Sequence, residues 1–177
     1  LSSILLSERF KDVKFWSFVN FRAKGIKVII GGIAASLAGA QSSLEHADAV
    51  LTGEAEDIWP TILEDARNGN LQQIYKPTSR PDINNLPLPR LDLLKKNKLG
   101  LWRPVQATRG CPFPCNFCSI TAYFEKSYRK QPVENVIRDV RAAKATGSKF
   151  IAFIDDNIGV DFKYAKKLWE ALIPEKI

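Results

Sequence analysis

The chain has 177 residues, 45% of them hydrophobic, so it can bury the core of one or two domains. Its ten Gly and ten Pro exclude collagen-like and low-complexity classes, and no apolar run approaches the ~18 residues of a membrane span. The net charge of +7 is divided unevenly, −2 over residues 1–75 and +9 over residues 76–177, which predicts two functional units. The chain begins at Leu1 and lacks Met, so we expect a piece of a longer protein.

The first part of the chain alternates between helical and strand patterns. We expect a helix over residues 7–25, a short strand over residues 26–30 that ends at Gly31 and Gly32, and a helix over residues 37–46. A second strand over residues 47–51 precedes Gly53 and Glu54, and Asp57 is expected to cap a helix over residues 57–68 that stops at Gly69. This order predicts a parallel sheet covered by helices.

Residues 76–102 are rich in proline and are predicted to be a linker that packs on a domain surface through its leucines. Basic residues are densest here, at Lys95, Lys96, Lys98 and Arg103. Leucines interleave with these charges, which favours a packed connector with solvated charges over a nucleic-acid-binding surface. Retention on heparin that falls steeply with salt would distinguish the nucleic-acid alternative.

The second unit is predicted to start near Arg103 with a strand through Val105 and Ala107 that ends at Arg109 and Gly110. A loop with the cysteines follows, then a helix from Pro132 to Gly147, a strand over residues 149–154, and a helix capped by Asp161. Such an order begins a β/α barrel or an open α/β sheet. Both architectures bind ligands at the carboxyl ends of their strands, where the cysteine loop and Asp155-Asp156-Asn157 fall.

Cys111, Cys115 and Cys118 form a CxxxCxxC motif in the stretch ATRGCPFPCNFCSI. Three thiolates on one loop suit a soft metal or three corners of an iron–sulfur cube. A structural zinc site needs a fourth ligand, and the only histidine, His46, lies far away in the other unit. The alternatives are structural zinc or buried inert thiols. Three clustered cysteines and no secretory leader also predict a reducing, cytoplasmic location.

The motif, its position after the first strand of a β/α unit and the aromatic Phe117 before the third cysteine resemble the radical S-adenosylmethionine (radical SAM) superfamily. The resemblance implies that Cys111, Cys115 and Cys118 hold a 4Fe-4S cluster whose fourth iron binds SAM. It implies that SAM is cleaved reductively to a 5′-deoxyadenosyl radical and that Phe117 lies along the adenine. Asp155, Asp156 and Asn157 stand where many members carry a GGE segment that contacts the SAM amino group.

Nearly the whole chain resembles radical SAM proteins with an N-terminal cobalamin-binding domain. The resemblance is carried by the segments KVIIGGIAASL, EHADAVLTGEAEDIWPTILEDARNG and NLPLPRLDLL. It implies the C-terminal part of a Rossmann-like domain over residues 1–75, the linker over 76–102, and the first β/α units of a partial TIM barrel over 103–177. Gly31, Gly32, Gly53 and Glu54 would then face the corrinoid. Two departures stand out: Ala34-Ala35 replaces a usual His-Pro pair, and the DxHxxG cobalt-ligand pattern is absent.

The resemblance further implies a small-molecule substrate and an electron donor such as flavodoxin or ferredoxin, with methyl transfer, ring formation and rearrangement all compatible. No residue is assigned as catalytic. Other interpretations remain at this point: a non-catalytic iron–sulfur fragment or subunit that needs the missing barrel, a plain turn at Gly31-Gly32, capping roles for Asp155 and Asp156, and an ordinary helix-end role for His46.

Overall fold

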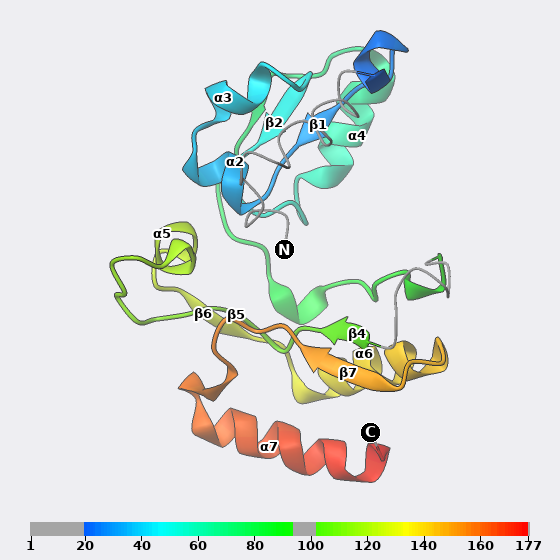
Figure 1. Ribbon diagram of the computed structural model, residues 1–177, viewed down its shortest axis with the longest axis vertical. Coiled ribbons are helices and arrows are strands. Elements are labelled where there is room, and N and C mark those ends of the chain that lie inside the picture. Colours follow the sequence, from blue (N-terminus) through cyan, green and yellow to red (C-terminus); the bar gives the residue numbers. More distant parts are fainter. Residues whose placement is uncertain (1–19, 94–101, 177) are drawn as a thin grey trace. The chain divides into compact units, whose positions relative to one another are not determined.

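A computed structural model describes residues 20–93 and 102–176 of the chain. The protein is a mixed α/β structure with small parallel sheets, and it separates into two compact units, Leu1–Pro81 and Asp82–Ile177 (Figure 1). The predicted helix over residues 7–25 falls mainly outside the described residues, of which 20–23 are helical. None of the helices within the described ranges has the length and apolar character that crossing a bilayer requires.

The first unit is built on a three-stranded parallel sheet in the order β1-β2-β3. Strand β1 (Ile29–Ile30) pairs with β2 (Ala49–Leu51), which pairs with β3 (Ile74–Tyr75). Helices α2 (Ile33–Leu37) and α3 (Ala40–Leu44) cover one face, and α4 (Trp59–Asn68) covers the other (Figure 1). Strand β2 is buried on both faces, as is typical of a central parallel strand.

Sequence periodicity gave the element types of this unit better than their limits. The single helix predicted over residues 37–46 was wrong, because Gly39 at φ +88° interrupts it and two short helices form. Helix α4 ends at Gly69 in the left-handed conformation, as predicted, but Ile58 rather than Asp57 is its N-cap. Strand β3 lies at the edge of the predicted linker and was missed.

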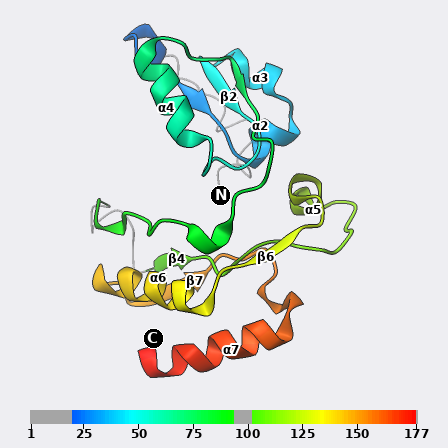
Figure 2. The ribbon, with the colours of Figure 1, turned by 180° about the vertical axis from the view of Figure 1, so that it is seen from behind.

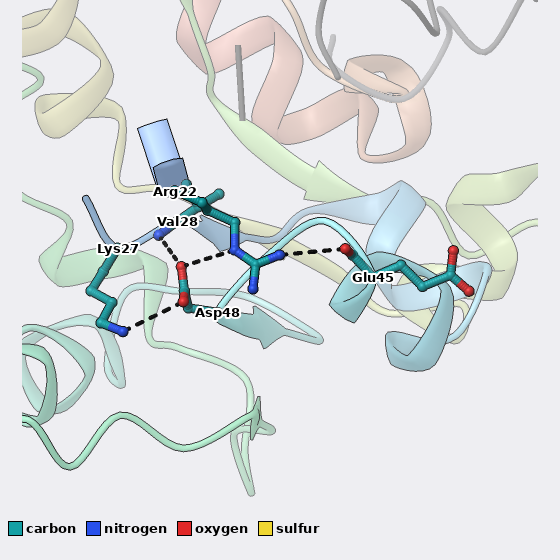
Figure 3. Close-up of polar contacts among 5 residues, drawn as sticks. All are labelled: Arg22, Lys27, Val28, Glu45 and Asp48. Atoms are coloured by element: carbon teal, nitrogen blue, oxygen red, sulfur yellow. Dashed lines mark hydrogen bonds and ion pairs between the residues drawn. The ribbon is translucent and has the colours of Figure 1, made fainter. Parts of the chain in front are cut away.

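Asp48 ties the chain before β1 to the start of β2 (Figure 3). One carboxylate oxygen accepts the Val28 N–H at 2.9 Å and lies 3.5 Å from Arg22 Nε, while the other lies 3.5 Å from Lys27 Nζ. Burial raises the pKa of Asp48, but the Val28 N–H and the charges of Lys27 and Arg22 outweigh it, so the pKa lies below 3.8. The ionised form of Asp48 therefore stabilises this unit.

The second unit contains a parallel pair, β4 (Trp102–Val105) with β7 (Phe150–Phe153), and an antiparallel pair, β5 (Thr108–Gly110) with β6 (Tyr128–Lys130). Helix α6 (Val133–Ala145) packs on the parallel pair and against α7 (Phe162–Leu172) (Figure 2). The apolar positions predicted for α6 are all buried: Val133, Val136, Ile137, Val140 and Ala143. Together with Val105, Ala107 and Leu168 they form the core of the unit.

Asp161 caps α7, as predicted, since its carboxylate accepts the Tyr164 N–H at 3.0 Å. On the predicted apolar face of α7, Ala165 and Leu168 are buried, whereas Phe162 is 76% exposed. Helix α5 (Ser119–Phe124) and strand β6 were missed, because their sequence was interpreted as a polar, aromatic loop.

The linker residues from Asp82 onward cluster with the second unit. Asn135 on α6 donates to the Asn84 carbonyl at 2.6 Å, and Arg138 donates to the Leu86 carbonyl at 3.2 Å. Lys95, Lys96 and Lys98 lie outside the described residues. Arg103, expected to be a solvated charge, is instead buried on β4 and donates to the Thr146 hydroxyl at 2.8 Å.

Replacing Asp48 by Asn should lower the free energy of unfolding by about 1–2 kcal/mol at neutral pH, because a charged acceptor and two ion pairs are lost. A carboxylate with a depressed folded pKa stabilises above its unfolded pKa and ceases to do so as the pH falls through the folded value. The gap between wild type and D48N in urea unfolding should therefore close below about pH 3.8. The exposed Asp57 supplies the control: D57N should change stability by less than about 0.5 kcal/mol.

Candidate functional site

The cysteine loop connects β5 to α5 in the second unit. Cys115 is exposed, and Cys111 and Cys118 are partly buried. The Cys118 N–H donates to the Cys115 carbonyl at 3.1 Å, and the Thr121 hydroxyl donates to the Phe113 carbonyl at 2.9 Å, so α5 holds the loop at two points. All three thiols thus come from one loop between two short elements.

Cys118 is the N-cap residue of α5, and its thiol has a lowered pKa. The backbone N–H groups of Thr121 and Ile120 are the main cause, and they outweigh burial and the Asp156 carboxylate, which raise it. A thiol whose ionised form is favoured is better prepared to act as a soft metal ligand.

No three His, Cys, Asp or Glu side chains in residues 20–93 and 102–176 are arranged to hold a metal ion. The three thiols are therefore gathered on one loop without converging on a single point. By chemistry the donors fit an iron–sulfur cluster, because three soft ligands can occupy three corners and leave one iron for another ligand. Phe117, placed along the adenine by resemblance, is 93% exposed between the last two cysteines.

Asp155 lies two residues after the end of β7 and holds the chain where it passes from β4 into β5. Its Oδ1 accepts the Ala107 N–H at 3.0 Å, the Thr108 N–H, and the Thr108 hydroxyl at 2.7 Å. Its Oδ2 is shielded from solvent and has no hydrogen-bond partner among the residues that the structure describes. Burial raises the pKa of Asp155 more than these hydrogen bonds lower it. In this conformation the carboxylate accepts hydrogen bonds from the backbone. A contact between Asp155 and SAM stays a prediction.

The prediction of one strand that runs through Val105 and Ala107 to Gly110 was wrong. The structure has two strands there, β4 and β5. Strand β4 ends at Val105, and Asp155 accepts the N–H groups of Ala107, between the two strands, and of Thr108, the first residue of β5. The chain then turns away from β7, and β5 pairs with β6 instead.

Gly110 is the residue that the sequence analysis missed at this site. It is buried at the end of β5 with φ +86°, and an added Cβ would collide with the Ser127 carbonyl oxygen and lie 3.2 Å from Phe124 Cβ. Its N–H donates to Asp156 Oδ2 at 2.8 Å. A glycine at the end of a strand pattern, directly before the first cysteine, is a sequence signal for such a close approach.

The glycine loops of the first unit follow β1 and β2. Gly32 and Gly53 have φ values of +97° and +103°, and the Ser36 hydroxyl donates to the Gly32 carbonyl and accepts the Gly53 N–H, both at 2.9 Å. Ser36 thus joins two loops that the sequence assigned to one cofactor. Gly31 is exposed, as a cofactor-facing residue would be.

Glu54 is only 8% exposed, and its carboxylate lies 3.3 Å from Arg80. Its assignment to the corrinoid stays a prediction. His46, with its side chain 3.8 Å from the Glu45 carboxylate, lies after α3 and belongs to neither site.

Gly110→Ala should destabilise the second unit more strongly than Gly147→Ala does. Both glycines have positive φ, which costs about 1–2 kcal/mol for alanine, but the space around Gly147 is open. The collision at Gly110 should add at least about 1 kcal/mol to that cost. Urea unfolding of the two variants would measure the difference, and equal losses would show that Ser127 and Phe124 shift easily to admit the added Cβ.

Comparison with known proteins gives the relatives of the chain. No family model matches it. It is 31% identical over 167 residues to the bacteriochlorophyllide d C-8(2)-methyltransferase of Chlorobaculum tepidum. The match covers 86% of this chain and 36% of that protein. The C-12(1)-methyltransferase of the same organism is 30% identical over 158 residues, covering 85% of this chain and 34% of that protein.

The hopanoid C-3 methylase of Methylococcus capsulatus is 32% identical over 168 residues, covering 84% of this chain and 32% of that protein. The chain therefore spans about a third of the length of the curated relatives it matches. Taken with the CxxxCxxC loop, these matches show that the chain is a partial member of the radical SAM superfamily, in the group with an N-terminal cobalamin-binding domain.

Proposed function

We propose that the chain is part of a radical SAM methyltransferase that acts on a small-molecule substrate. The observation that carries the proposal is that Cys111, Cys115 and Cys118 share one accessible loop, in which the Cys118 thiol has a lowered pKa. The methyltransferases to which the chain is similar support methyl transfer over the ring-forming and rearranging alternatives.

The three cysteines would hold a 4Fe-4S cluster, with one iron left for the amino and carboxylate groups of SAM. When bound and reduced, such a cluster supplies the electron that cleaves a carbon–sulfur bond of SAM. A flavodoxin or ferredoxin is the class of protein that would deliver this electron. Phe117 would cover the adenine, since an exposed ring between two ligands can stack on a bound base.

The first unit is proposed to be the C-terminal part of a Rossmann-like domain that binds cobalamin through Gly31, Gly32, Gly53 and Glu54. The helix-covered parallel sheet and the Ser36 link between its glycine loops support this assignment. The second unit is proposed to begin a partial TIM barrel, which its parallel β4–β7 pair and intervening α6 support. The domain limits at residues 75 and 102 belong to the same proposal.

Anaerobic reconstitution with iron and sulfide should load about four iron atoms per chain and give an EPR signal that shifts when SAM is added. Cys115→Ala should lose the cluster without unfolding the chain, because Cys115 is exposed. Asn116→Ala, an exposed neighbour in the same loop, is the matched control and should keep it. Zinc in place of iron, or a cluster indifferent to SAM, would contradict the proposal and favour a structural loop.

Phe117→Ala should leave the iron content unchanged and weaken SAM binding by about tenfold, because the ring on which the adenine would stack is removed. The same truncation at Phe162, which is also exposed, should leave both unchanged. SAM titrations followed by EPR would measure the difference. Equal SAM affinities in the two variants would remove Phe117 from the SAM site.

A further inference from the structure

Three consecutive side chains after β7 contact successive parts of the segment that leads into the cysteine loop. Asp155 binds the backbone at Ala107 and Thr108, Asp156 binds that of Gly110, and Asn157 contacts Cys111. The chain after β7 runs past β5 before it descends to α7 (Figure 1). The Asp155-Asp156-Asn157 segment therefore contacts residues 107–111 in the same chain order.

The backbone at Gly110 is held from two sides. On one side, Gly110 packs against Ser127 and Phe124 so closely that a Cβ does not fit. On the other, Asp156 Oδ2 accepts its N–H at 2.8 Å. This hydrogen bond helps to fix the backbone position from which Cys111 departs.

Asn157 acts on the thiol of Cys111 itself. Its Nδ2 group donates to Cys111 Sγ at 3.9 Å, a distance at which sulfur still accepts a hydrogen bond. Side chains that hydrogen-bond a metal ligand orient it, and their loss weakens metal binding even though they never touch the metal. Asn157 is placed to orient the Cys111 thiol in this way.

We propose that Asp156 and Asn157 are positioning residues, which hold the Gly110–Cys111 peptide and the Cys111 thiol in the orientation that the cluster requires. The inference rests on the proposed function for the identity of the bound group. It differs from the role implied by resemblance, in which this segment contacts SAM directly. A positioning role predicts an effect in the metal-free chain, and a SAM contact predicts none there.

The first test is amide hydrogen exchange in the metal-free full chain. Asp156→Ala should speed exchange of the Gly110 amide by about tenfold or more, since its acceptor is gone. Asp156→Asn keeps an acceptor oxygen of the same reach and should exchange at close to the wild-type rate. Unchanged exchange in α6 would show that both variants remain folded.

The second test is iron binding. Asp156→Ala and Asn157→Leu should each weaken the retention of iron against a chelator by about 10–100-fold, whereas Asp156→Asn should retain it. Asn157→Leu should also lower the reduction potential, because a hydrogen bond to a ligand sulfur stabilises the reduced cluster.

The outcomes separate the inference from the proposed function. Unchanged Gly110 exchange in Asp156→Ala would overturn the positioning role, and weaker SAM binding alongside it would assign Asp156 to SAM. Unchanged iron retention in both variants would overturn the role toward the cluster. Faster Gly110 exchange in Asp156→Ala, together with a wild-type chain that takes up no iron, would contradict the proposed function while supporting the hold of Asp156 on the loop.

Discussion

The path of the second unit depends on the Asp155 carboxylate and the backbone donors of Ala107 and Thr108. Without that acceptor, the N–H groups of Ala107, between β4 and β5, and of Thr108, the first residue of β5, would need another partner or water, since buried donors left unpaired are costly. Because one oxygen accepts both, β4 can leave its parallel partner after Val105. The chain then forms the antiparallel β5–β6 pair, and the cysteine loop begins directly after β5.

The same arrangement explains why the sequence predicted the second unit unevenly. The faces of α6 and the cap of α7 depend on local periodicity and on one capping side chain, and both were confirmed. The break at Ala107 depends on Asp155, 48 residues further along the chain, so no local pattern could indicate it. Helix α5 and strand β6 were not predicted, because a polar, aromatic stretch has no clear hydrophobic periodicity.

In the first unit, the strand pattern predicted the parallel sheet, and Gly69 predicted the end of helix α4. The helix predicted over residues 37–46 looked continuous in the sequence, but Gly39 interrupts it. The two glycine loops could be found from sequence, but their connection could not. Ser36 precedes the helix that was predicted over residues 37–46, and its hydroxyl bonds both to Gly32 and to Gly53, which lies 17 positions after Ser36. The cysteine site could be predicted from spacing alone, whereas Asp156 and Asn157, which contact Gly110 and Cys111, lie 46 positions further along the chain.

Gly110 bears on how this loop could be redesigned. Every other amino acid adds at least a Cβ, and the space beside Gly110 is filled by backbone atoms, which cannot move aside as a flexible side chain would. Phe113, Cys115 and Phe117, by contrast, are exposed. A mutant library of this loop should therefore keep residue 110 constant and place its diversity at positions 113, 114, 116 and 117, where new side chains would face solvent.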